Sequence, residues 1–170
     1  PITCVMPVLA NWDLTVAAAD DCLKQSIPTR LLLIDNGSGP EARAACQQFV
    51  ADRVTGIPDG TCAFPVLSWH HSPPLPSLSA PWNRALRFVW EAGGTHAFVI
   101  NNDLRIWPET YETLLSVQQE TGAWFVTGTG VTEGEFHTFC ESGDAPGARM
   151  PSYPLPGPDF SCYLITKEAH

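Results

Sequence analysis

Positive charge is scarce in this chain. Lys and Arg number 9 against 18 Asp and Glu, which gives a formal net charge of -9 over 170 residues. A nucleic-acid binder covers its contact surface with basic side chains, because it has to neutralise phosphates, so the composition argues against that class. An acidic protein can still bind a nucleotide, since a bound divalent cation reverses the local charge. A nucleotide or another phosphorylated small molecule therefore stays open as a partner.

Several motifs that identify common protein classes are also missing. No Gly-x-Gly-x-x-Gly follows an expected strand, so a dinucleotide fold of the usual type is unsupported, and the absence of Gly-x4-Gly-Lys-Ser/Thr excludes a P-loop. No Gly-x-Ser-x-Gly nucleophile turn is present. No apolar stretch is long enough to cross a bilayer. The chain opens on an expected strand, so we expect no secretory signal.

Paired cysteine motifs are absent as well. None of the six cysteines forms a Cys-x-x-Cys pair, which makes a zinc ribbon unexpected; they are Cys4, Cys22, Cys46, Cys62, Cys140 and Cys162. Cys4 and Cys162 fall in expected strands, and Cys22 and Cys46 on expected helices. We interpret them as small buried side chains in a reducing compartment rather than as disulfides. A cytoplasmic location follows, with the inner face of the membrane as a peripheral alternative.

The length of the chain suits one domain with a substantial core. Hydrophobic residues make up 44% of the sequence and charged residues 16%, which is ordinary for a globular protein. We expect a single domain over residues 1–170. The chain begins with Pro1 rather than Met, and Thr166–His170 is typical of the start of a helix. We therefore expect it to be a piece of a longer protein, truncated at its carboxyl end.

Strand and helix patterns alternate four times before the pattern becomes rich in strands. Such alternation with short links predicts an α/β fold, a mostly parallel central sheet between two helical layers, with right-handed crossovers. The apolar run within 30–34 is typical of a strand covered on both faces. Expected strands lie at 2–6, 30–34, 65–69, 96–100, 123–131, 135–140 and 160–166, expected helices at 14–25, 40–50, 81–92 and 108–122, and expected loops at 70–81 and 141–158.

Two local rules set the first boundaries in this prediction. Pro7 is expected to stop the first strand, because proline lacks the N–H that a sheet uses. Asn11-Trp12-Asp13 is expected to cap the first helix, since Asn and Asp side chains accept hydrogen bonds from the free N–H groups of the first turn. Ser38 and Glu41 have the spacing of a capping box at the start of the second helix.

The tripeptide Asn101-Asn102-Asp103 is the strongest candidate for a functional site. It follows the apolar run 96–100. Polar side chains at the carboxyl end of a buried strand lie where open α/β sheets bind ligands. A carboxylate there can hold a divalent cation, which in turn can hold phosphate. The alternative is that Asp103 only forms a turn or caps a helix.

Asp35 occupies the matching place at the end of the second strand. In a doubly wound sheet, Asp35 and Asp103 would face the same crevice. The alternative for Asp35 alone is a turn former, since Asp35-Asn36-Gly37-Ser38 is strong turn chemistry.

The start of the third helix is a further candidate for anion binding. Backbone N–H groups at a helix start favour anions, and Arg84 within Pro81-Trp82-Asn83-Arg84 adds a cation. A solvated helix start explains the same residues equally well. His70 and His71 are adjacent, and adjacent strand residues point to opposite faces. We therefore interpret them as histidines at the edge of a loop rather than as a metal pair.

Taken in order, these segments resemble the GT-A-fold glycosyltransferases, in particular the large family 2 group. The resemblance covers nearly the whole chain, and it is carried by the order and spacing of motifs that are each weak alone. The matching segments are Ile2–Asn11 (first strand with its Pro and Asn), Leu33–Ser38 (the V-D-N-G-S segment), Trp82–Leu86 (the R-N-x-G-L helix start), Gly94–Asp103 (the strand leading into a DxD-type motif) and Phe160–Ile165 (a strand flanking the acceptor site).

The resemblance implies a metal-assisted, inverting transfer of a sugar, of the hexosyltransferase type, from a nucleotide-diphospho-sugar to an acceptor hydroxyl. It implies a donor of the UDP, GDP or dTDP type, a glycan, lipid or protein acceptor, and Mg²⁺ or Mn²⁺ at Asp103. Residues 1–107 would form the nucleotide-binding half and 108–170 the acceptor side. Asp35 would contact the base and Asn102 the ribose. The implied donor contacts are Pro7, Asn11, Asp35, Asn83, Arg84, Asn101 and Asn102.

The chain departs from the family pattern in three places. Asn102 replaces the first Asp of the DxD motif, and Ala85 replaces the usual Gly. The family's general base follows the strand at 160–166, so it is expected beyond His170, and Asp159 does not match it. One alternative is therefore a GT-A-like domain that binds nucleotide or sugar without turnover. A nucleotidyltransferase is a weaker alternative, because it needs a glycine-rich basic loop that Pro7–Asp13 lacks.

Overall fold

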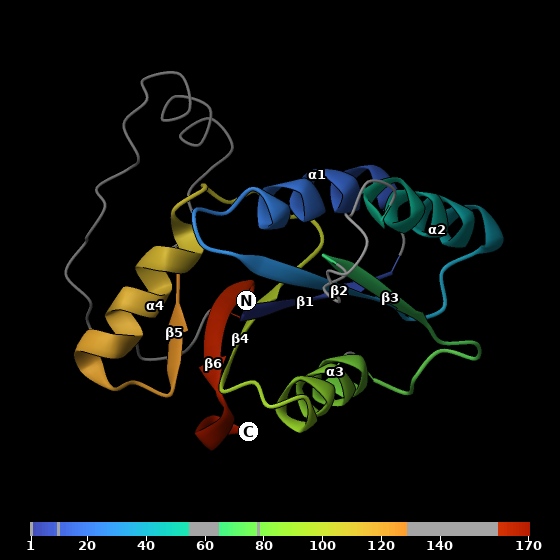
Figure 1. Ribbon diagram of the computed structural model, residues 1–170. Helices are drawn as coiled ribbons and strands as arrows, with labels where there is room; N and C mark the ends of the chain where they lie inside the picture. Colours follow the sequence, from blue (N-terminus) through green and yellow to red (C-terminus); the bar gives the residue numbers. More distant parts are fainter. Residues whose placement is uncertain (1, 10, 55–64, 78, 129–159) are drawn as a thin grey trace.

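The computed structural model of the protein describes residues 2–9, 11–54, 65–77, 79–128 and 160–170 (Figure 1). Its elements, in chain order, are β1 (Ile2–Val8), α1 (Trp12–Leu23), β2 (Thr29–Asp35), α2 (Pro40–Val54), β3 (Val66–His70), α3 (Ser79–Glu91), β4 (His96–Ile100), α4 (Thr110–Thr121), β5 (Phe125–Thr127), β6 (Cys162–Thr166) and the short 3-10 helix η1 (Lys167–Ala169).

The strands form one sheet in the order β3-β2-β1-β4-β6-β5. Strands β1 to β4 are parallel, and β6 runs antiparallel between β4 and β5. The predicted α/β fold with a mostly parallel sheet is confirmed. The carboxyl ends of β1 to β4 meet at one edge of the sheet, which we call the carboxyl edge.

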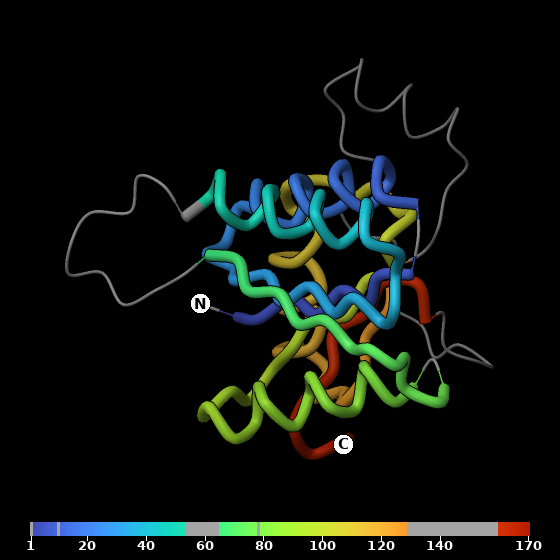
Figure 2. Tube along the Cα trace, turned by 90° about the vertical axis from the view of Figure 1, so that its right-hand side faces the viewer, coloured from blue at the N-terminus to red at the C-terminus, as the bar shows by residue number. Residues whose placement is uncertain are grey.

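Helices cover both faces of the sheet, which makes the fold three-layered. α1 and α2 lie on one face and α3 on the other, as Figures 1 and 2 show, and Tyr111 of α4 packs in the same core as α1. Side chains of β2 alternate between the two cores: Leu31 and Leu33 pack under α1 and α2, while Leu32 and Ile34 pack under α3. Because both faces are buried there, the strand is apolar from Leu31 to Ile34.

The first strand continues past Pro7, so the predicted stop there is wrong. Pro7 pairs with Ile34 of β2, and β1 ends at Val8. On the other side, the pairing of β1 with β4 runs only from Thr3 to Val5. A residue without an N–H can therefore be accommodated beyond Val5, where only one neighbouring strand is paired.

The first helix begins at Trp12. Asn11 is its N-cap residue, as predicted, but the expected side-chain hydrogen bond is absent. Asn11 instead adopts a left-handed backbone conformation with φ 54. Its carbonyl oxygen accepts hydrogen bonds from both the amide and the hydroxyl of Thr15, each at 3.0 Å.

Most of the remaining boundaries lie near those expected. The strand expected at 123–131 is an exception, because β5 is only Phe125–Thr127, and residues 129–131 lie outside the described residues. The strand at 96–100 is confirmed at both ends, and α3 begins at Ser79 rather than residue 81. The expected strand at 135–140 and the loop at 141–158 lie outside the described residues. Where the sequence predicts a helix start, η1 is present. No helix in the described ranges has the length and apolar character needed to span a bilayer.

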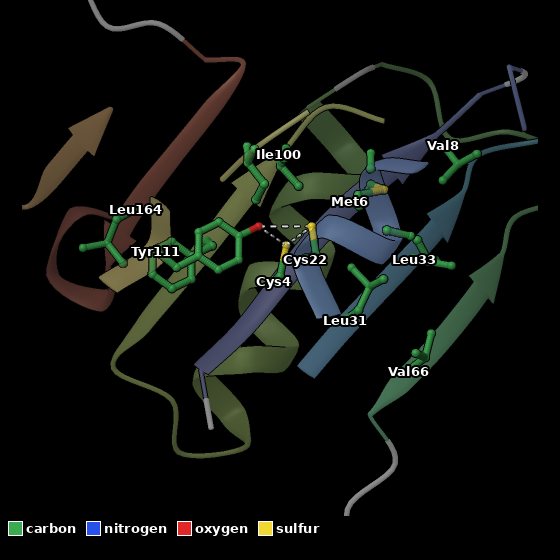
Figure 3. Close-up of a cluster of buried hydrophobic side chains, with 14 of the residues drawn as sticks. Cys4, Met6, Val8, Cys22, Leu31, Leu33, Val66, Ile100, Tyr111 and Leu164 are labelled. Carbon is green, nitrogen blue, oxygen red and sulfur yellow. Dashed lines mark hydrogen bonds between the residues drawn. The ribbon is translucent and has the colours of Figure 1, made fainter. Parts of the chain in front are cut away.

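A buried cluster joins α1, β1 and α4 on the face of the sheet that α1 covers (Figure 3). The hydroxyl oxygen of Tyr111 lies 2.8 Å from Sγ of Cys4 and 3.2 Å from Sγ of Cys22. The Tyr111 ring stacks on Phe98 with a centroid distance of 3.8 Å. Burial raises the pKa of the Cys4 thiol well above its ordinary value, so the thiol stays protonated at neutral pH. Within the described residues, the prediction of buried cysteines without disulfides is confirmed for Cys4, Cys22 and Cys46, whereas Cys162 forms no disulfide but is only partly buried. Cys62 and Cys140 lie outside the described residues.

Candidate functional site

Asp35 ends β2 at the carboxyl edge, and both of its carboxylate oxygens accept hydrogen bonds. Oδ1 accepts the backbone N–H of Ser38 at 2.8 Å, and Oδ2 accepts Nδ1–H of His70 at 2.7 Å. His70 is in reach because β2 and β3 pair with Asp35 opposite His70. The Asp35 side chain is only 2% exposed. Asp35 therefore forms the turn that its sequence suggested, and it is also held in a fixed orientation by a neighbouring strand.

The turn after Asp35 is fixed to the loop between β3 and α3. The side-chain oxygen of Asn36 accepts the amide of Leu75 at 2.8 Å. Gly37 has a φ of +98, and a Cβ added there would lie 2.8 Å from the ring of Pro74. A larger residue at Gly37 would suffer both an unfavourable backbone conformation and a clash. The two loops thus support Asp35 and His70 together.

The pKa of Asp35 is lower than its ordinary value of 3.8. Burial pushes the pKa upward, but the hydrogen bonds from Ser38 and the bond and charge of His70 outweigh it. The carboxylate is therefore ionised at neutral pH and can accept further hydrogen bonds from a ligand.

This lowered pKa predicts a pH-dependent contribution of Asp35 to stability. The unfolded chain binds a proton at a higher pH than the folded chain, so the contribution is complete above the unfolded pKa and is lost as pH falls through the folded pKa. We expect the difference in urea midpoint between the wild type and Asp35→Asn to hold from about pH 7 to about pH 5 and to shrink below about pH 4. Asp13→Asn, which removes an exposed carboxylate, is the control. A difference that stays constant down to about pH 3 would contradict the assignment.

Asp35 lies in the wall of a pocket of about 490 Å³ at the end of β3. The pocket is bounded by α2, β3 and α3, and its lining residues are Asp35, Arg43, Cys46, Gln47, Ser68, Trp69, His70, His71 and Arg84. The guanidinium of Arg84 lies over the Trp69 ring, 5.9 Å from its centroid. The pocket thus combines an ionised carboxylate with cationic and aromatic side chains.

The second part of the predicted site lies at the end of β4. The amide of Asn101 donates to the carbonyl oxygen of Ser161 at 2.9 Å. The side-chain Nδ2 of Asn102 donates to Oγ1 of Thr15 in α1 at 2.8 Å. Asp103 is exposed to solvent. The tripeptide is therefore attached to Ser161, the residue before β6, and to the first turn of α1, while Asp103 is exposed.

The structure places Asp35 and Asp103 at the same edge of the sheet, with one strand between their strands. Neighbouring strands lie about 4.8 Å apart, so β2 and β4 are separated by about 10 Å. Asp103 does not line the pocket around Asp35. The two carboxylates thus share an edge but occupy separate places on it.

The other sequence-predicted residues lie at or near this edge. Pro7 is the residue before the last one of β1, and Asn11 directly precedes α1. Asn83 and Arg84 lie near the amino end of α3, where both are exposed. Of these, Arg84 lines the pocket with Asp35.

A divalent cation fits this edge only if a ligand brings further oxygen atoms. Among the described residues, no group of three His, Cys, Asp or Glu side chains is placed to hold a metal. Hard cations take six or more oxygen ligands, and Asp103 supplies one carboxylate. The remaining positions would come from phosphate oxygens and water, which suits a cation that arrives with a diphosphate.

Sequence reasoning missed His70, His71 and Arg43 as parts of the pocket. His70 was expected at the edge of a loop, but it is the last residue of β3 and bonds Asp35. Extending the third strand by one residue would have placed His70 beside the strand carrying Asp35. Arg43 could not be found from the sequence. The spacing of residues in a helix shows which side chains share a face, but it does not show which pocket that face borders.

Comparison with solved structures finds glycosyltransferases with a similar fold. The chain is similar to the mannosyltransferase PcManGT from Pyrobaculum calidifontis in complex with GDP-Man and Mn²⁺, with a TM-score of 0.71 and 14% identity over 98% of this chain and 44% of that one. It is also similar to S. aureus TarS 1-349 in complex with UDP-GlcNAc, with a TM-score of 0.56 and 14% identity over 78% of this chain and 37% of that one.

The chain therefore spans less than half the length of either protein. No protein-family model and no curated protein matches the sequence. At this level of identity, the similarity shows a shared fold.

Proposed function

We propose that the chain is the donor-binding part of a glycosyltransferase, which moves a sugar from a nucleotide-diphospho-sugar to an acceptor hydroxyl with inversion. The observation that carries the proposal is the carboxyl edge, where Asp35 lines a pocket of about 490 Å³ and Asp103 is exposed on the same edge. Structures of similar fold contain GDP-Man with Mn²⁺ and UDP-GlcNAc, which supports a nucleotide-sugar as the ligand.

Asp35 is suited to select the base of the donor. An ionised carboxylate only accepts hydrogen bonds, so it favours a base whose ring carries an N–H. In a nucleotide, uracil, thymine and guanine carry such a ring group, whereas neutral adenine and cytosine donate only through an exocyclic amino group. Asp35 is held by Ser38 and His70, so its orientation is set before a ligand arrives. The proposed donor is therefore of the UDP, dTDP or GDP type.

The diphosphate is proposed to lie at the end of β4, on the other side of β1 from the base. Asp103, Asn101 and Asn102 would face it, and the N–H groups at the start of α1 favour anions at the same place. Mg²⁺ or Mn²⁺ bound at Asp103 would neutralise charge on the departing diphosphate. Asn11 and Pro7, from the loop and strand before α1, would border the nucleotide between these two ends.

The acceptor hydroxyl must lose a proton as it attacks the anomeric carbon, and the nucleotide diphosphate then leaves. A carboxylate that takes this proton contributes roughly 10²–10⁴-fold in rate. We assign none of the described residues to this role. Residues 108–170 are proposed to carry the acceptor side, as the resemblance implies.

One observation favours a second candidate, a domain that binds the nucleotide-sugar without turning it over. Asn102 stands where the family has the first Asp of its metal motif, and its side chain donates a hydrogen bond to Thr15. This hydrogen bond of the Asn102 side chain connects the segment after β4 to α1. Asp103 is then left as the protein's direct metal ligand, which suits binding better than catalysis.

Calorimetric titration with nucleotides tests the proposed function. We expect UDP, GDP or dTDP to bind in the presence of Mn²⁺ and to bind more weakly without it, whereas ADP and CDP bind weakly in both conditions. Absence of Mn²⁺-dependent binding for all of UDP, GDP and dTDP would reject the donor site. Release of nucleotide from the matching sugar donor in the presence of an acceptor would then separate the enzyme from the binding domain.

A further inference from the structure

Figure 1 shows β3 at the outer side of the sheet, with α2 and α3 on opposite faces. Two hollows border this strand and form a groove beside it. The pocket beside Asp35 continues into a second hollow of about 330 Å³, and the two share Trp69 and Arg84. The residues that define this β3-edge groove are Arg43, Trp69, His71, Arg84, Arg87 and Phe88. Arg84, Arg87 and Phe88 are spaced three and four residues apart, so they share one face of α3.

The groove concentrates unpaired positive charge in an acidic protein. Arg43, Arg84 and Arg87 line it, and within the described part of the chain none of them forms an ion pair. By contrast, Arg53 pairs with Asp20 and Arg105 with Asp21. Arg30, outside the groove, also forms no ion pair with a described residue. The clustering of three exposed arginines beside one hollow, in a protein with a net charge of -9, is what favours an anionic ligand.

The acidic groups at the groove do not neutralise these arginines. Asp35 lies at one end and accepts hydrogen bonds from Ser38 and His70. Glu91 lines the second hollow one helical turn after Arg87 and forms no ion pair with it. The centre of the groove, around Trp69 and Arg84, is therefore cationic.

His71 supplies a second, independent sign that a ligand group is missing. Its Nε2 is buried and has no hydrogen-bond partner among the described residues, and a buried polar atom without a partner costs free energy. Burial and the neighbouring charges of Arg84 and His70 lower the pKa of His71. An anionic oxygen in the pocket would give this nitrogen a partner.

We propose that the β3-edge groove binds a phosphate-bearing ligand, whose phosphate oxygens contact Arg43 from α2 and Arg84 and Arg87 from α3. The planar guanidinium presents its N–H groups in a fork that matches phosphate oxygens. Trp69 and Phe88, whose rings meet edge to face at 5.0 Å, give an apolar wall for the carbon skeleton. The site shares the Asp35 pocket and Arg84 with the proposed donor site, and it extends beyond that site along β3 to Arg87 and Phe88.

Calorimetry in the presence of EDTA tests this site without any metal at Asp103. The probes are inorganic pyrophosphate and long-chain polyphosphate, and the variants are Arg43→Gln and Arg87→Gln. Each variant removes a hydrogen bond between a guanidinium group and a phosphate oxygen. We expect this loss to weaken the binding of the probe about tenfold. Arg30→Gln is the matched control, because Arg30 is an exposed arginine of β2 outside the groove; it loses the same charge and should bind as the wild type does.

The outcomes separate this site from the donor site. Arg87→Gln should leave Mn²⁺-dependent binding of UDP, GDP or dTDP unchanged, so the groove and the proposed function can fail independently. Much tighter binding of polyphosphate than of pyrophosphate would indicate that the ligand is a phosphate polymer. Similar binding of the two probes would indicate a small phosphorylated molecule. No binding of either probe, or an equal loss in Arg30→Gln, would overturn the proposal.

Discussion

Replacing Asp103 with Ala is expected to remove the gain in nucleotide affinity that Mn²⁺ gives, while binding without metal persists. In our account, Asp103 is the protein's direct ligand to the cation. Losing it should cost at least the roughly 10- to 100-fold in affinity that is typical when a supporting residue of a metal site is lost. Because Asp103 is exposed, the variant should fold normally, which a thermal melt can verify.

The matched control for this variant is Asp13→Ala. Asp13 is an exposed carboxylate in the first turn of α1, so its removal changes the charge near the same edge of the sheet without removing the proposed ligand. Titration of UDP, GDP and dTDP with and without Mn²⁺ compares the two variants. Normal metal-dependent binding by Asp103→Ala would show that another residue holds the cation.

Replacing Phe98 with Ala is expected to destabilise the protein by about 3–5 kcal/mol, the usual cost of removing a buried aromatic side chain. Phe98 is 0% exposed and stacks on Tyr111 in the core between the sheet and α1. The substitution would leave a cavity beside Tyr111 and remove the stacked ring. For a chain of this size, we expect the midpoint of thermal unfolding to fall by roughly 6–20 °C.

Phe88→Ala provides the comparison, because Phe88 is 38% exposed on α3. This variant should cost less than about 1 kcal/mol, since surface substitutions have small effects. Urea unfolding of both variants measures the two free energies. A cost for Phe98→Ala no larger than that for Phe88→Ala would contradict the placement of Phe98 in the core.

The order of elements could be predicted because apolar runs and helix signals alternate clearly. The strand at 96–100 was delimited correctly, since Gly93-Gly94 ends the preceding helix and Asn101 begins a polar segment. Strand boundaries that depend on the neighbouring strand were not predictable. Pro7 continues β1 because of how β2 and β4 pair with it, and a single-strand pattern does not contain that information.

The candidate site could be predicted only in part for a similar reason. Alternation places Asp35 at the carboxyl edge, but the bond between Asp35 and His70 depends on the register of β2 against β3. Likewise, Arg43 and Arg84 lie far apart in the sequence and border one pocket because α2 and α3 pack on opposite faces beside the same edge strand. The register between strands and the packing of helices depend on the whole fold, so the sequence pattern of one segment does not predict them.

The central claim is that the carboxyl ends of β2 and β4 bind one ligand together. Nuclear magnetic resonance of the backbone amides, during titration with Mg²⁺ and the best nucleotide diphosphate, tests this directly. We predict that the signals of Asn36–Ser38 and of Asn101–Leu104 shift together and give the same dissociation constant. Shifts confined to one of these segments, or centred on the opposite edge at Thr29 and His96, would contradict the claim.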